Sequence, residues 1–448
     1  LAMQADTVFL GASTDPWDKW AIKALARLCR RGTQLVTRPG SNLPRDALED
    51  AGFRTAADSA PAIAGPMPPS HFYEPRWNLA HNRKGNTSTP VKEPARCAVV
   101  GAGLAGASVA HALAVRGWQV TVLDQHPGPA GGASGLPVGL VVPHVSADDS
   151  PRSRMSRSGT RLMLHHARRL LTEGEDWAPS GVLEHRDAHE GDLWHPMAGW
   201  IKPARLVQAW MNHPGIRFMG DTAVVGLRWQ DGTWCVQGDA GQALARAEHV
   251  VLANGFGCQA LLHSLAGAAD LEHDVLPKAA VLQELHGTLS YGPCPAGMSD
   301  IAGWPRTPVN GNGSFIPAVP SGAGLHWYAG STFETKRAAM ADLPTQHLAN
   351  QLHLRALLPA VEAVLAPAFD SGAVASWSST RCVTHDRLPL VGPLQAIANN
   401  SLWICAGMGA RGLSFSALCA ELLAAQLHGE PLPVEASLAR GLSALRPR

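Results

Sequence analysis

Apolar residues in two parts of the chain follow the alternation of strands and helices that is typical of α/β domains. In the first part, the spacing predicts a strand, a helix, a strand and a helix at residues 6–10, 17–29, 34–37 and 43–51. In the second part, an apolar run at 97–100 leads into a glycine-rich turn, a helix as far as Arg116 and a strand at 119–123. The first part is long enough for only half of such a domain.

The pattern changes twice in the rest of the chain. Residues 59–94 hold many prolines and no sustained period, which predicts a linker. Residues 190–340 contain strand-like alternation, for example at 233–236 and 326–329, and predict an antiparallel sheet. Near the end, an apolar run, a glycine-rich turn and an apolar helix at 414–427 return to the α/β pattern. We therefore expect an α/β protein whose middle part is α+β.

Composition and charge narrow the class of protein. Of 448 residues, 46% are hydrophobic and 16% are charged, which favours a compact fold with large cores. The net charge of +1 gives no field that would draw the whole molecule to nucleic acid, so a nucleic-acid surface must be local. The eight cysteines lack zinc-site spacing, and no apolar run reaches about 18 residues. We expect reduced thiols, no metal, no membrane contact and a cytoplasmic protein.

The glycine-rich turn of the second α/β part reads Gly101-x-Gly103-x-x-Gly106. These glycines permit a tight turn, the approach of backbone amides to a pyrophosphate, and close packing of helix on strand. Asp124 ends the following strand, where a carboxylate accepts hydrogen bonds from ribose hydroxyls. A turn that serves packing alone is the alternative, but the flanking strand, helix and acid favour a dinucleotide. The residues assigned to it are Gly101, Gly103, Leu104, Ala105, Gly106 and Asp124.

Two further glycine-rich segments favour FAD over NAD, which the first motif alone does not distinguish. A helix N-terminus directed at the flavin ring would stabilise the negative charge that develops there on reduction. The later of the two segments comes directly before the apolar helix, so it would form such a helix N-terminus. The alternative is an ordinary strand-to-helix turn, which would have the same sequence. The cofactor residues assigned here are Ala133, Ser134, Gly135, Gly139 and Leu140, then Gly407, Met408, Gly409, Arg411, Gly412 and Leu413.

Two groups of charged residues are candidates for substrate contacts. Arg381 lies among apolar residues and would clamp a carboxylate or face the flavin, and a structural salt bridge with Asp386 is the alternative. A helix that begins after Pro151 would carry basic residues at spacings of three and four along one face. That face would contact phosphates, or it would be an ordinary solvated helix face. Its residues are Arg154, Arg157, Arg161, His165 and Arg168.

Together these motifs resemble the FAD-dependent oxidoreductase half of the MnmC family, bifunctional bacterial enzymes that build 5-methylaminomethyl-2-thiouridine in tRNA. More broadly, the sequence is similar to the D-amino-acid-oxidase superfamily. The resemblance runs from about residue 97 to 448, and it adds Ala253, Asn254 and Gly255 to the cofactor residues. Its most distinctive segments are residues 381–392, 407–413, 418–426 and 431–437.

The resemblance divides the chain into three parts. Residues 1–58 are similar to the end of the family's methyltransferase half, 59–94 are a proline-rich linker, and 95–448 are the oxidoreductase. Within the oxidoreductase, a Rossmann-like FAD-binding domain is expected at about 95–190, 220–260 and 375–430. A substrate domain with an antiparallel sheet is expected at about 190–220 and 260–375.

The methyltransferase-like part departs from the family. The S-adenosylmethionine-binding strand and glycine loop do not appear in residues 1–58, so methyltransferase activity is expected to be absent from this chain. The missing half would then precede Leu1, or a separate methyltransferase would complete the modification. A second departure lies at residues 277–281, where relatives commonly have Gly-Gln.

The resemblance implies oxidative removal of the carboxymethyl group from 5-carboxymethylaminomethyluridine at the tRNA wobble position, which gives aminomethyluridine and glyoxylate. It implies FAD as cofactor, tRNA as partner, Arg381 and Arg411 as candidate catalytic residues, and a tRNA surface at Arg154, Arg157, Arg161 and Arg168. Two other functions stay open. One is a flavin oxidase of a small amine such as glycine or sarcosine, and the other is a non-catalytic tRNA-binding remnant.

Overall fold

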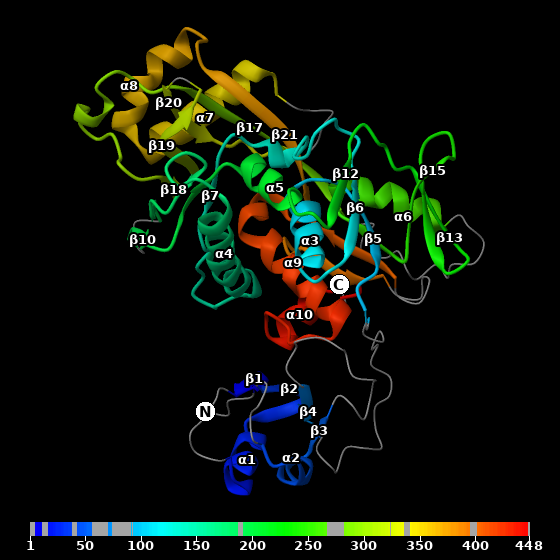
Figure 1. Ribbon diagram of the computed structural model, residues 1–448. Coiled ribbons are helices and arrows are strands. Elements are labelled where there is room, and N and C mark those ends of the chain that lie inside the picture. Colours follow the sequence, from blue (N-terminus) through cyan, green and yellow to red (C-terminus); the bar gives the residue numbers. More distant parts are fainter. Residues whose placement is uncertain are drawn as a thin grey trace. The chain divides into compact units, whose positions relative to one another are not determined.

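The computed structural model describes residues 5–10, 17–37, 43–55, 70–73, 91, 93–186, 191–266, 282–322, 324–335, 341–394 and 401–446 (Figure 1). The chain divides into two compact units. The smaller unit comprises Leu1–Glu93 and Ala424–Arg440, and the larger comprises Pro94–Leu423 and Gly441–Arg448. Residues 277–281 lie outside the described residues. Within the described ranges, no helix combines the length and the apolar character that a membrane span requires.

The described strands of the smaller unit form one sheet in the order β1-β2-β4-β3. The predicted order of elements in residues 6–51 is confirmed, and Ile22, Leu35, Leu48 and Phe53 form its buried core. Helix α1 begins after Asp18, whose carboxylate accepts hydrogen bonds from two backbone amides of the first turn. The elements are β1 (Ala5–Leu10), α1 (Lys19–Ala26), β2 (Cys29–Thr37), α2 (Arg45–Ala51), β3 (Phe53–Thr55) and β4 (Ser70–Tyr73).

Strand β4 lies inside the proline-rich region that the sequence predicts to be a linker. It pairs antiparallel with β2, where His71 is opposite Leu35, and with β3, where Phe72 is opposite Arg54. Because this pairing joins segments that are distant in the sequence, local composition does not reveal it. The region is therefore not wholly without regular structure.

A six-stranded sheet in the described part of the larger unit has the order β12-β6-β5-β16-β23-β22. All neighbours are parallel except β22 and β23. Three distant sequence segments thus supply one sheet, whose inner residues Val100, Val250 and Ile404 are at most 4% exposed. The strands are β5 (Arg96–Val100), β6 (Gln119–Leu123), β12 (Ile216–Met219), β16 (His249–Leu252), β22 (Leu390–Pro393) and β23 (Leu402–Ala406).

Two helices follow glycine-rich turns beside this sheet. Helix α3 (Leu104–Ala114) follows β5, and α9 (Gly412–His428) follows β23. They lie close together (Figure 1), because Ser108 donates a hydrogen bond to the carbonyl of Ser416 and Arg116 pairs with Glu421 at 2.8 Å. The two turns therefore end at the same edge of the sheet, where parallel strands place their carboxyl ends.

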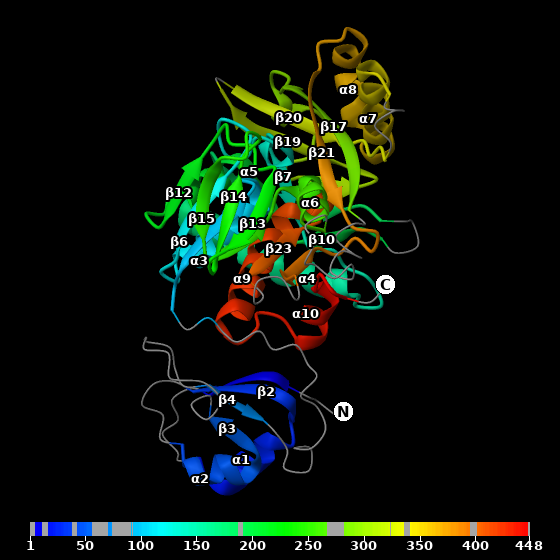
Figure 2. The same cartoon turned by 90° about the vertical axis from the view of Figure 1, so that its right-hand side faces the viewer.

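A seven-stranded, mostly antiparallel sheet forms the other layer, in the order β10-β9-β18-β19-β20-β17-β21 among the described strands. Helices α7 (Leu343–Leu357) and α8 (Pro359–Asp370) cover its outer face (Figure 2), where Phe315, Trp327 and Leu365 are buried. Tyr328 follows Trp327 and points to the opposite face, as strand periodicity requires. The strands are β9 (Val182–Glu184), β10 (Leu193–His195), β17 (Gln283–Pro293), β18 (Val309–Gly311), β19 (Gly313–Ser321), β20 (Gly324–Gly330) and β21 (Ala375–Val383).

The two layers exchange strands at positions that differ from the expected domain limits. Strand β12 belongs to the six-stranded sheet, although residues 190–220 are expected in the substrate domain. Strands β9 and β21 belong to the seven-stranded sheet, although the sequence places both in the FAD-binding domain. Each strand's layer is decided by its pairing partner, since β12 pairs with β6 and β21 pairs with β17.

The six remaining described strands form two further three-stranded sheets. Helix α4 (Pro151–Leu170) begins at the predicted position, and α5 (Pro203–Met211) packs with it around Trp210 and Met163. The other elements are β7 (Gly139–Val141), β8 (Trp177–Ala178), β11 (Gly199–Ile201), β13 (Gly226–Gln230), β14 (Thr233–Gln237), β15 (Ala243–Ala247), α6 (Cys258–Ala266) and α10 (Ala436–Leu442).

Candidate cofactor and substrate site

The turn between β5 and α3 requires glycine at its three motif positions. Gly101 has φ +102°, and a Cβ there would lie 2.7 Å from the carbonyl oxygen of Ala253. A Cβ at Gly106 would lie 1.8 Å from the carbonyl oxygen of Gly101, so only glycine lets α3 pack on this turn. A Cβ at Gly103 would lie 2.9 Å from the hydroxyl of Ser134. The α3 N-terminus therefore presents bare backbone to the space before it.

Asp124 and Ser134 fix the same turn by hydrogen bonds. One carboxylate oxygen of Asp124 accepts from the amide of Ala102 at 2.7 Å, and the other accepts from the amide of His126 at 2.9 Å. The Ser134 hydroxyl accepts from the amide of Leu104 at 2.8 Å. The predicted acid thus lies beside the turn, and Ser134 joins it from a segment 30 residues later.

A cavity of about 830 Å³ lies between the two sheets of the larger unit. Every predicted cofactor residue lines it except Gly106 and Gly135, which lie within the turns that form its wall. The candidate catalytic residues Arg381 and Arg411 also line it, whereas Arg154, Arg157, Arg161 and Arg168 do not. The structure thus brings together three glycine-rich segments and two arginines from distant parts of the chain.

Residues 407–413 form the cavity wall opposite the α3 turn. Gly407 and Gly409 have φ +77° and +58°, and a Cβ at Gly407 would lie 2.9 Å from the Thr384 side chain. Met408 forms a bridge with Val383 at the end of β21. This turn opens α9 inside the cavity, which is the position expected for a helix N-terminus directed at a flavin ring.

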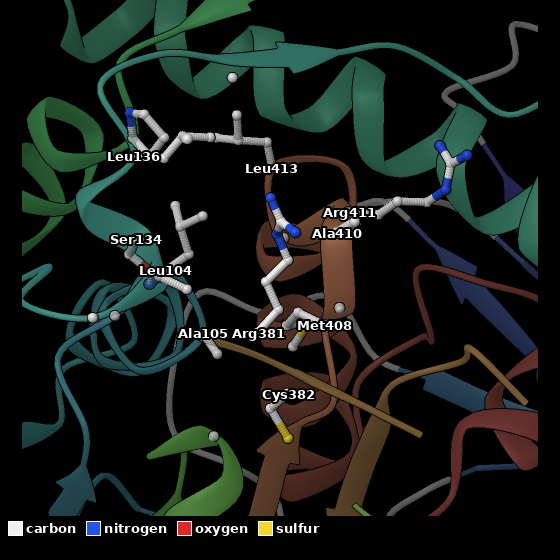
Figure 3. A pocket seen from close by; sticks show the side chains of 18 of the residues that line it. Leu104, Ala105, Ser134, Leu136, Arg381, Cys382, Met408, Ala410, Arg411 and Leu413 are labelled. Carbon is white, nitrogen blue, oxygen red and sulfur yellow. Dashed lines mark hydrogen bonds between the residues drawn. The ribbon is translucent and has the colours of Figure 1, made fainter. Parts of the chain in front are cut away.

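Arg381 reaches into the cavity from β21 (Figure 3). Its Nη2 donates a hydrogen bond to the Ser331 hydroxyl at 2.9 Å, and its guanidinium carbon lies 5.1 Å from the centre of the Phe333 ring. Its Nη1 is buried and has no hydrogen-bond partner. Burial lowers the pKa of Arg381 to about 10, which still leaves the group charged at neutral pH. It is a cation that lacks an anion within the described structure.

Gly287 on β17 makes the space for this guanidinium. A Cβ at Gly287 would lie 2.3 Å from Nη1 of Arg381 and 2.6 Å from the carbonyl oxygen of Thr332. Strand pairing brings the two together, since β17 and β21 are neighbours with Leu285 opposite Arg381. The sequence analysis did not identify Gly287, Ser331 or Phe333, because no local motif marks them.

The alternative that pairs Arg381 with Asp386 is wrong. Asp386 instead forms two hydrogen bonds of 2.8 Å with Arg446 near the end of the chain. The two residues are close in sequence, but Arg381 lies within strand β21 and lines the cavity, whereas Asp386 lies in the turn after that strand. Because Asp386 pairs with Arg446, Arg381 stays available for a ligand.

Arg411 leaves the α9 turn in a different direction from Arg381 (Figure 3). Desolvation lowers its pKa, and the nearby Arg152 lowers it further, while Glu184 opposes them. Glu184 lines the cavity from β9 and is 2.5 Å from Nε2 of His195. Arg411 is therefore part of a charged group on the α4 side of the cavity and does not form a pair with Arg381.

The predicted basic face exists on α4. Its opposite side is buried at Met155, Gly159 and Met163. Arg161 and Arg168 are exposed, as predicted, whereas Arg157 is partly neutralised by Asp149 at 2.5 Å. Arg154 is half-buried and does not lie on the fully exposed part of the face. The face lies outside the cavity, so any phosphates that it contacts belong to a large ligand.

The cysteines that line the cavity are thiols. Burial raises the pKa of Cys382 to about 12, and burial raises the pKa of Cys405 to about 12. A thiolate nucleophile is therefore not available at these positions at neutral pH. Within the described residues, no group of histidine, cysteine and acidic side chains has the arrangement of a metal site. The arrangement supports ligand binding and hydride chemistry by a cofactor.

The residues present fit FAD. The α3 turn offers backbone without obstructing side chains at a helix N-terminus for a pyrophosphate, Asp124 lies at the ribose position, and the α9 turn offers a second helix N-terminus. A Cβ at any of the three motif glycines would fill the cradle or displace its wall. These observations concern both ends of a long cofactor, and they support the flavin more strongly than a nicotinamide dinucleotide.

Comparisons with known proteins agree with this geometry. The family model described as FAD dependent oxidoreductase matches residues 96–190 and 164–426. A protein of Albidiferax ferrireducens named tRNA 5-methylaminomethyl-2-thiouridine biosynthesis bifunctional protein MnmC is 46% identical, over 96% of this chain and 72% of its own length. A protein of the same name from Polaromonas naphthalenivorans is 42% identical, over 97% of this chain and 72% of its own length.

Solved structures show the same fold. Glycine oxidase from Geobacillus kaustophilus superimposes with a TM-score of 0.62 at 17% identity, and covers 80% of this chain and 100% of its own. L-proline dehydrogenase from P. horikoshii superimposes with a TM-score of 0.58 at 14% identity, and covers 79% of this chain and 98% of its own. At these identities the similarity concerns the fold alone.

Proposed function

Because the chain belongs to the family of FAD-dependent oxidoreductases and, within it, to the MnmC proteins, we propose that it oxidises a modified wobble uridine of tRNA. The substrate group is the carboxymethylaminomethyl group at C5 of uridine or 2-thiouridine. The products are aminomethyluridine and glyoxylate. The names of the relatives support tRNA modification, and the geometry of the cavity supports the reaction at a secondary amine that carries a carboxylate.

The observation that carries this proposal is the unpaired Arg381 guanidinium in the cavity that the glycine turns surround. Nη1 is buried without a partner, and Nη2 contacts only the neutral hydroxyl of Ser331. A buried cation is stable when an anion pairs with it, and a guanidinium binds a carboxylate through two parallel hydrogen bonds. The substrate carboxylate would occupy that position and hold the adjacent CH₂ group in the cavity.

The reaction balances with the groups present. The secondary amine, as free base, loses a hydride from the N–CH₂–COO⁻ carbon and the proton on nitrogen, and water hydrolyses the resulting imine to amine and glyoxylate. Bound FAD supplies the oxidant, because its N5 position accepts a hydride. The chain supplies position, since Arg381 fixes the carboxylate and the apolar side chains of Leu104, Leu413 and Tyr328 narrow the cavity. No strong base is required.

The α4 face is the proposed tRNA surface. Arg161 and Arg168 are exposed and lie on the same side of the helix. Arg157 contributes less, because Asp149 offsets part of its charge. The substrate is a polyanion, so neutralised phosphates release counterions and contribute to binding. Replacing Arg161 and Arg168 with glutamine should weaken tRNA binding by about tenfold at moderate salt, whereas bleaching by a free nucleoside should not change.

The test is anaerobic bleaching of the flavin in the purified protein. We expect tRNA that carries carboxymethylaminomethyluridine to reduce the flavin, and unmodified tRNA, glycine and sarcosine to leave it oxidised. Bleaching by glycine or sarcosine alone would show a small-amine oxidase and would contradict the proposal. A colourless protein that FAD cannot reconstitute would show a non-catalytic remnant.

We further propose that this chain does not transfer the methyl group itself. Residues 1–58 contain neither the S-adenosylmethionine-binding strand nor the glycine loop of the family. Incubation of the product tRNA with this chain and labelled S-adenosylmethionine should give no labelled nucleoside, and incorporation of label would contradict this part of the proposal.

A further inference from the structure

Two phenylalanines in the described part of the chain line the cavity and are exposed to solvent. Phe256 is 39% exposed and Phe333 is 55% exposed. Phe256 directly follows Gly255, one of the predicted cofactor residues, on the side of the six-stranded sheet. Phe333 follows β20 on the side of the seven-stranded sheet, where Arg381 lies. A large apolar side chain is therefore open to ligands on the substrate side of the cavity.

The backbone on both sides of Phe333 is fixed against β17. The amide of Thr332 donates a hydrogen bond to the carbonyl of Thr288 at 3.1 Å, and Glu334 and His286 exchange two backbone hydrogen bonds of 2.8 and 3.0 Å. Thr332 is buried, and so is one carboxylate oxygen of Glu334. Because side chains alternate along an extended segment, Phe333 points to the opposite side, into the cavity. The exposed ring is therefore held in place by the sheet.

Phe333 lies beside the carboxylate site. The guanidinium carbon of Arg381 lies over one face of its ring, 5.1 Å from the ring centre. Ser331, which accepts a hydrogen bond from Arg381, lines the cavity two residues before Phe333. More than half of Phe333 stays exposed in spite of the Arg381 contact, so the rest of the ring surface is open to a ligand. A flat apolar group next to the bound carboxylate would cover it.

The length of the proposed substrate group brings the uracil ring to this phenylalanine. A carboxylate that forms two hydrogen bonds with Arg381 has its carbon about 4 Å from the guanidinium carbon. Four bonds separate that carboxylate carbon from C5 of uracil, which is about 5 Å in an extended chain. C5 therefore lies within about 9 Å of the guanidinium carbon, and the Phe333 ring centre lies 5.1 Å from the same carbon. Stacked rings have their centres about 4.5 to 7 Å apart, so the base can stack on Phe333 while Arg381 holds the carboxylate.

We propose that Phe333 binds the uracil ring of the reacting nucleotide by stacking, an inference that rests on the proposed function. Stacking on an aromatic side chain contributes about tenfold to the binding of a base. The contact favours the nucleotide over sarcosine, which has the same N–CH₂–COO⁻ group but no base. Arg381 binds the carboxylate and Phe333 binds the base, so two neighbouring side chains determine the class of substrate.

The first test measures anaerobic bleaching of the flavin by the free nucleoside 5-carboxymethylaminomethyluridine. Phe333→Leu should raise the half-saturating concentration about tenfold and leave the limiting rate unchanged, because the base contributes to binding and Arg381 still places the reacting carbon. Phe333→Tyr keeps an aromatic face and should resemble the wild type. Phe9→Leu, which alters an exposed phenylalanine on β1, is the matched control. No change in Phe333→Leu, or an equal loss in Phe333→Tyr, would overturn the proposal.

The second test separates base stacking from support of Arg381 and needs no turnover. Its ligands are two ethers in which oxygen replaces the reacting nitrogen: 5-carboxymethoxymethyluridine, which carries the base, and methoxyacetate, which does not. Equilibrium dialysis gives the Kd of each ligand for the wild type and for Phe333→Leu. We expect the Kd of the uridine ether to rise about tenfold and that of methoxyacetate to stay unchanged. Equal rises for both ligands would show that Phe333 acts only through Arg381, and would overturn the proposal.

The two tests distinguish this inference from the proposed function. If no substrate bleaches the flavin but the Kd of the uridine ether still rises in Phe333→Leu, the proposed function fails and the base site stands. If the modified tRNA bleaches the flavin and Phe333→Leu binds the uridine ether as tightly as the wild type does, the base site alone fails.

Discussion

The two walls of the cavity are built in different ways. The six-stranded sheet contributes turns of backbone and glycine, in which Gly101, Gly103 and Gly106 remove side chains so that a ligand can approach. The seven-stranded sheet contributes a side chain, Arg381, which needs Gly287, Ser331 and Phe333 from other segments around it. The first wall depends on the absence of atoms, and the second depends on the placement of one charge. Changes to the two walls should therefore have different consequences.

The largest effect should come from Gly101→Ala. Its φ of +102° and the 2.7 Å approach to the Ala253 carbonyl oxygen make any side chain incompatible with the turn. We expect the variant to be purified without flavin, as measured by absorbance near 450 nm, a wavelength typical of oxidised flavins. Gly128→Ala is the matched control, because nothing lies within 4 Å of its added Cβ. A yellow Gly101→Ala protein would show that the turn is not the cofactor cradle.

Arg381→Gln should impair the wall formed by the seven-stranded sheet and leave the cofactor wall unchanged. The variant should retain its flavin, but kcat/KM for the modified tRNA should fall by about 100-fold, since loss of one partner of a buried charge pair costs about 3 kcal/mol. Stopped-flow reduction kinetics would measure this loss. Arg228→Gln, which alters an exposed arginine on β13, serves as control, and normal kinetics for Arg381→Gln would rule out the carboxylate clamp.

Gly287→Ala tests the placement of the charge without removing it. The new Cβ would lie 2.3 Å from Nη1 of Arg381 and 2.6 Å from the Thr332 carbonyl, so the guanidinium must move. We expect full flavin content and a reduction rate lowered by about tenfold, a smaller loss than that of Arg381→Gln. Gly324→Ala on the same sheet has open space at its Cβ and should behave as wild type. Loss of flavin in Gly287→Ala would show that the two walls are not independent.

The smallest effect should concern the helices behind the seven-stranded sheet. Glu362 accepts hydrogen bonds from Arg355 at 3.0 and 3.1 Å and from Gln351 at 2.8 Å, and these contacts lower its pKa below 4.5. Because the folded pKa is depressed, its stabilisation is present above about pH 4.5 and is lost as the pH falls through the folded pKa. Glu362→Gln should lower Tm by a few degrees at pH 7, and the difference should shrink as the pH falls from 4.5 through the folded pKa.

Thermal unfolding at several pH values would measure this difference. Asp370→Asn, on the same helix, is the control and should show a smaller shift at pH 7. Flavin content should be unchanged in both variants, because this contact lies on the face of the sheet turned away from the cavity. A Tm difference for Glu362→Gln that does not shrink as the pH falls below 4.5 would contradict the assigned role of the carboxylate.

The cofactor wall could be predicted because its determinants are local. They lie in one continuous segment, which contains a strand, three glycines at fixed spacing and an acid at the end of the next strand. Of the three glycines and the acid, all but Gly106 line the cavity. The opposite wall could be predicted only in part. Arg381 was identified, but its competing partner Asp386 was excluded only by Arg446, which is 60 residues away.

The sequence by itself determined the alternation of elements, the glycine turns, the basic face of α4 and the family to which the chain belongs. These features depend on periodicity and on steric limits of the backbone, which act over a few residues. Tertiary structure alone decided which strands share a sheet, which glycine faces Arg381, and that Arg411 lies near Arg152 and Glu184. Those relations depend on strand pairing and burial between distant segments, where the free energy belongs to the contact and not to either segment.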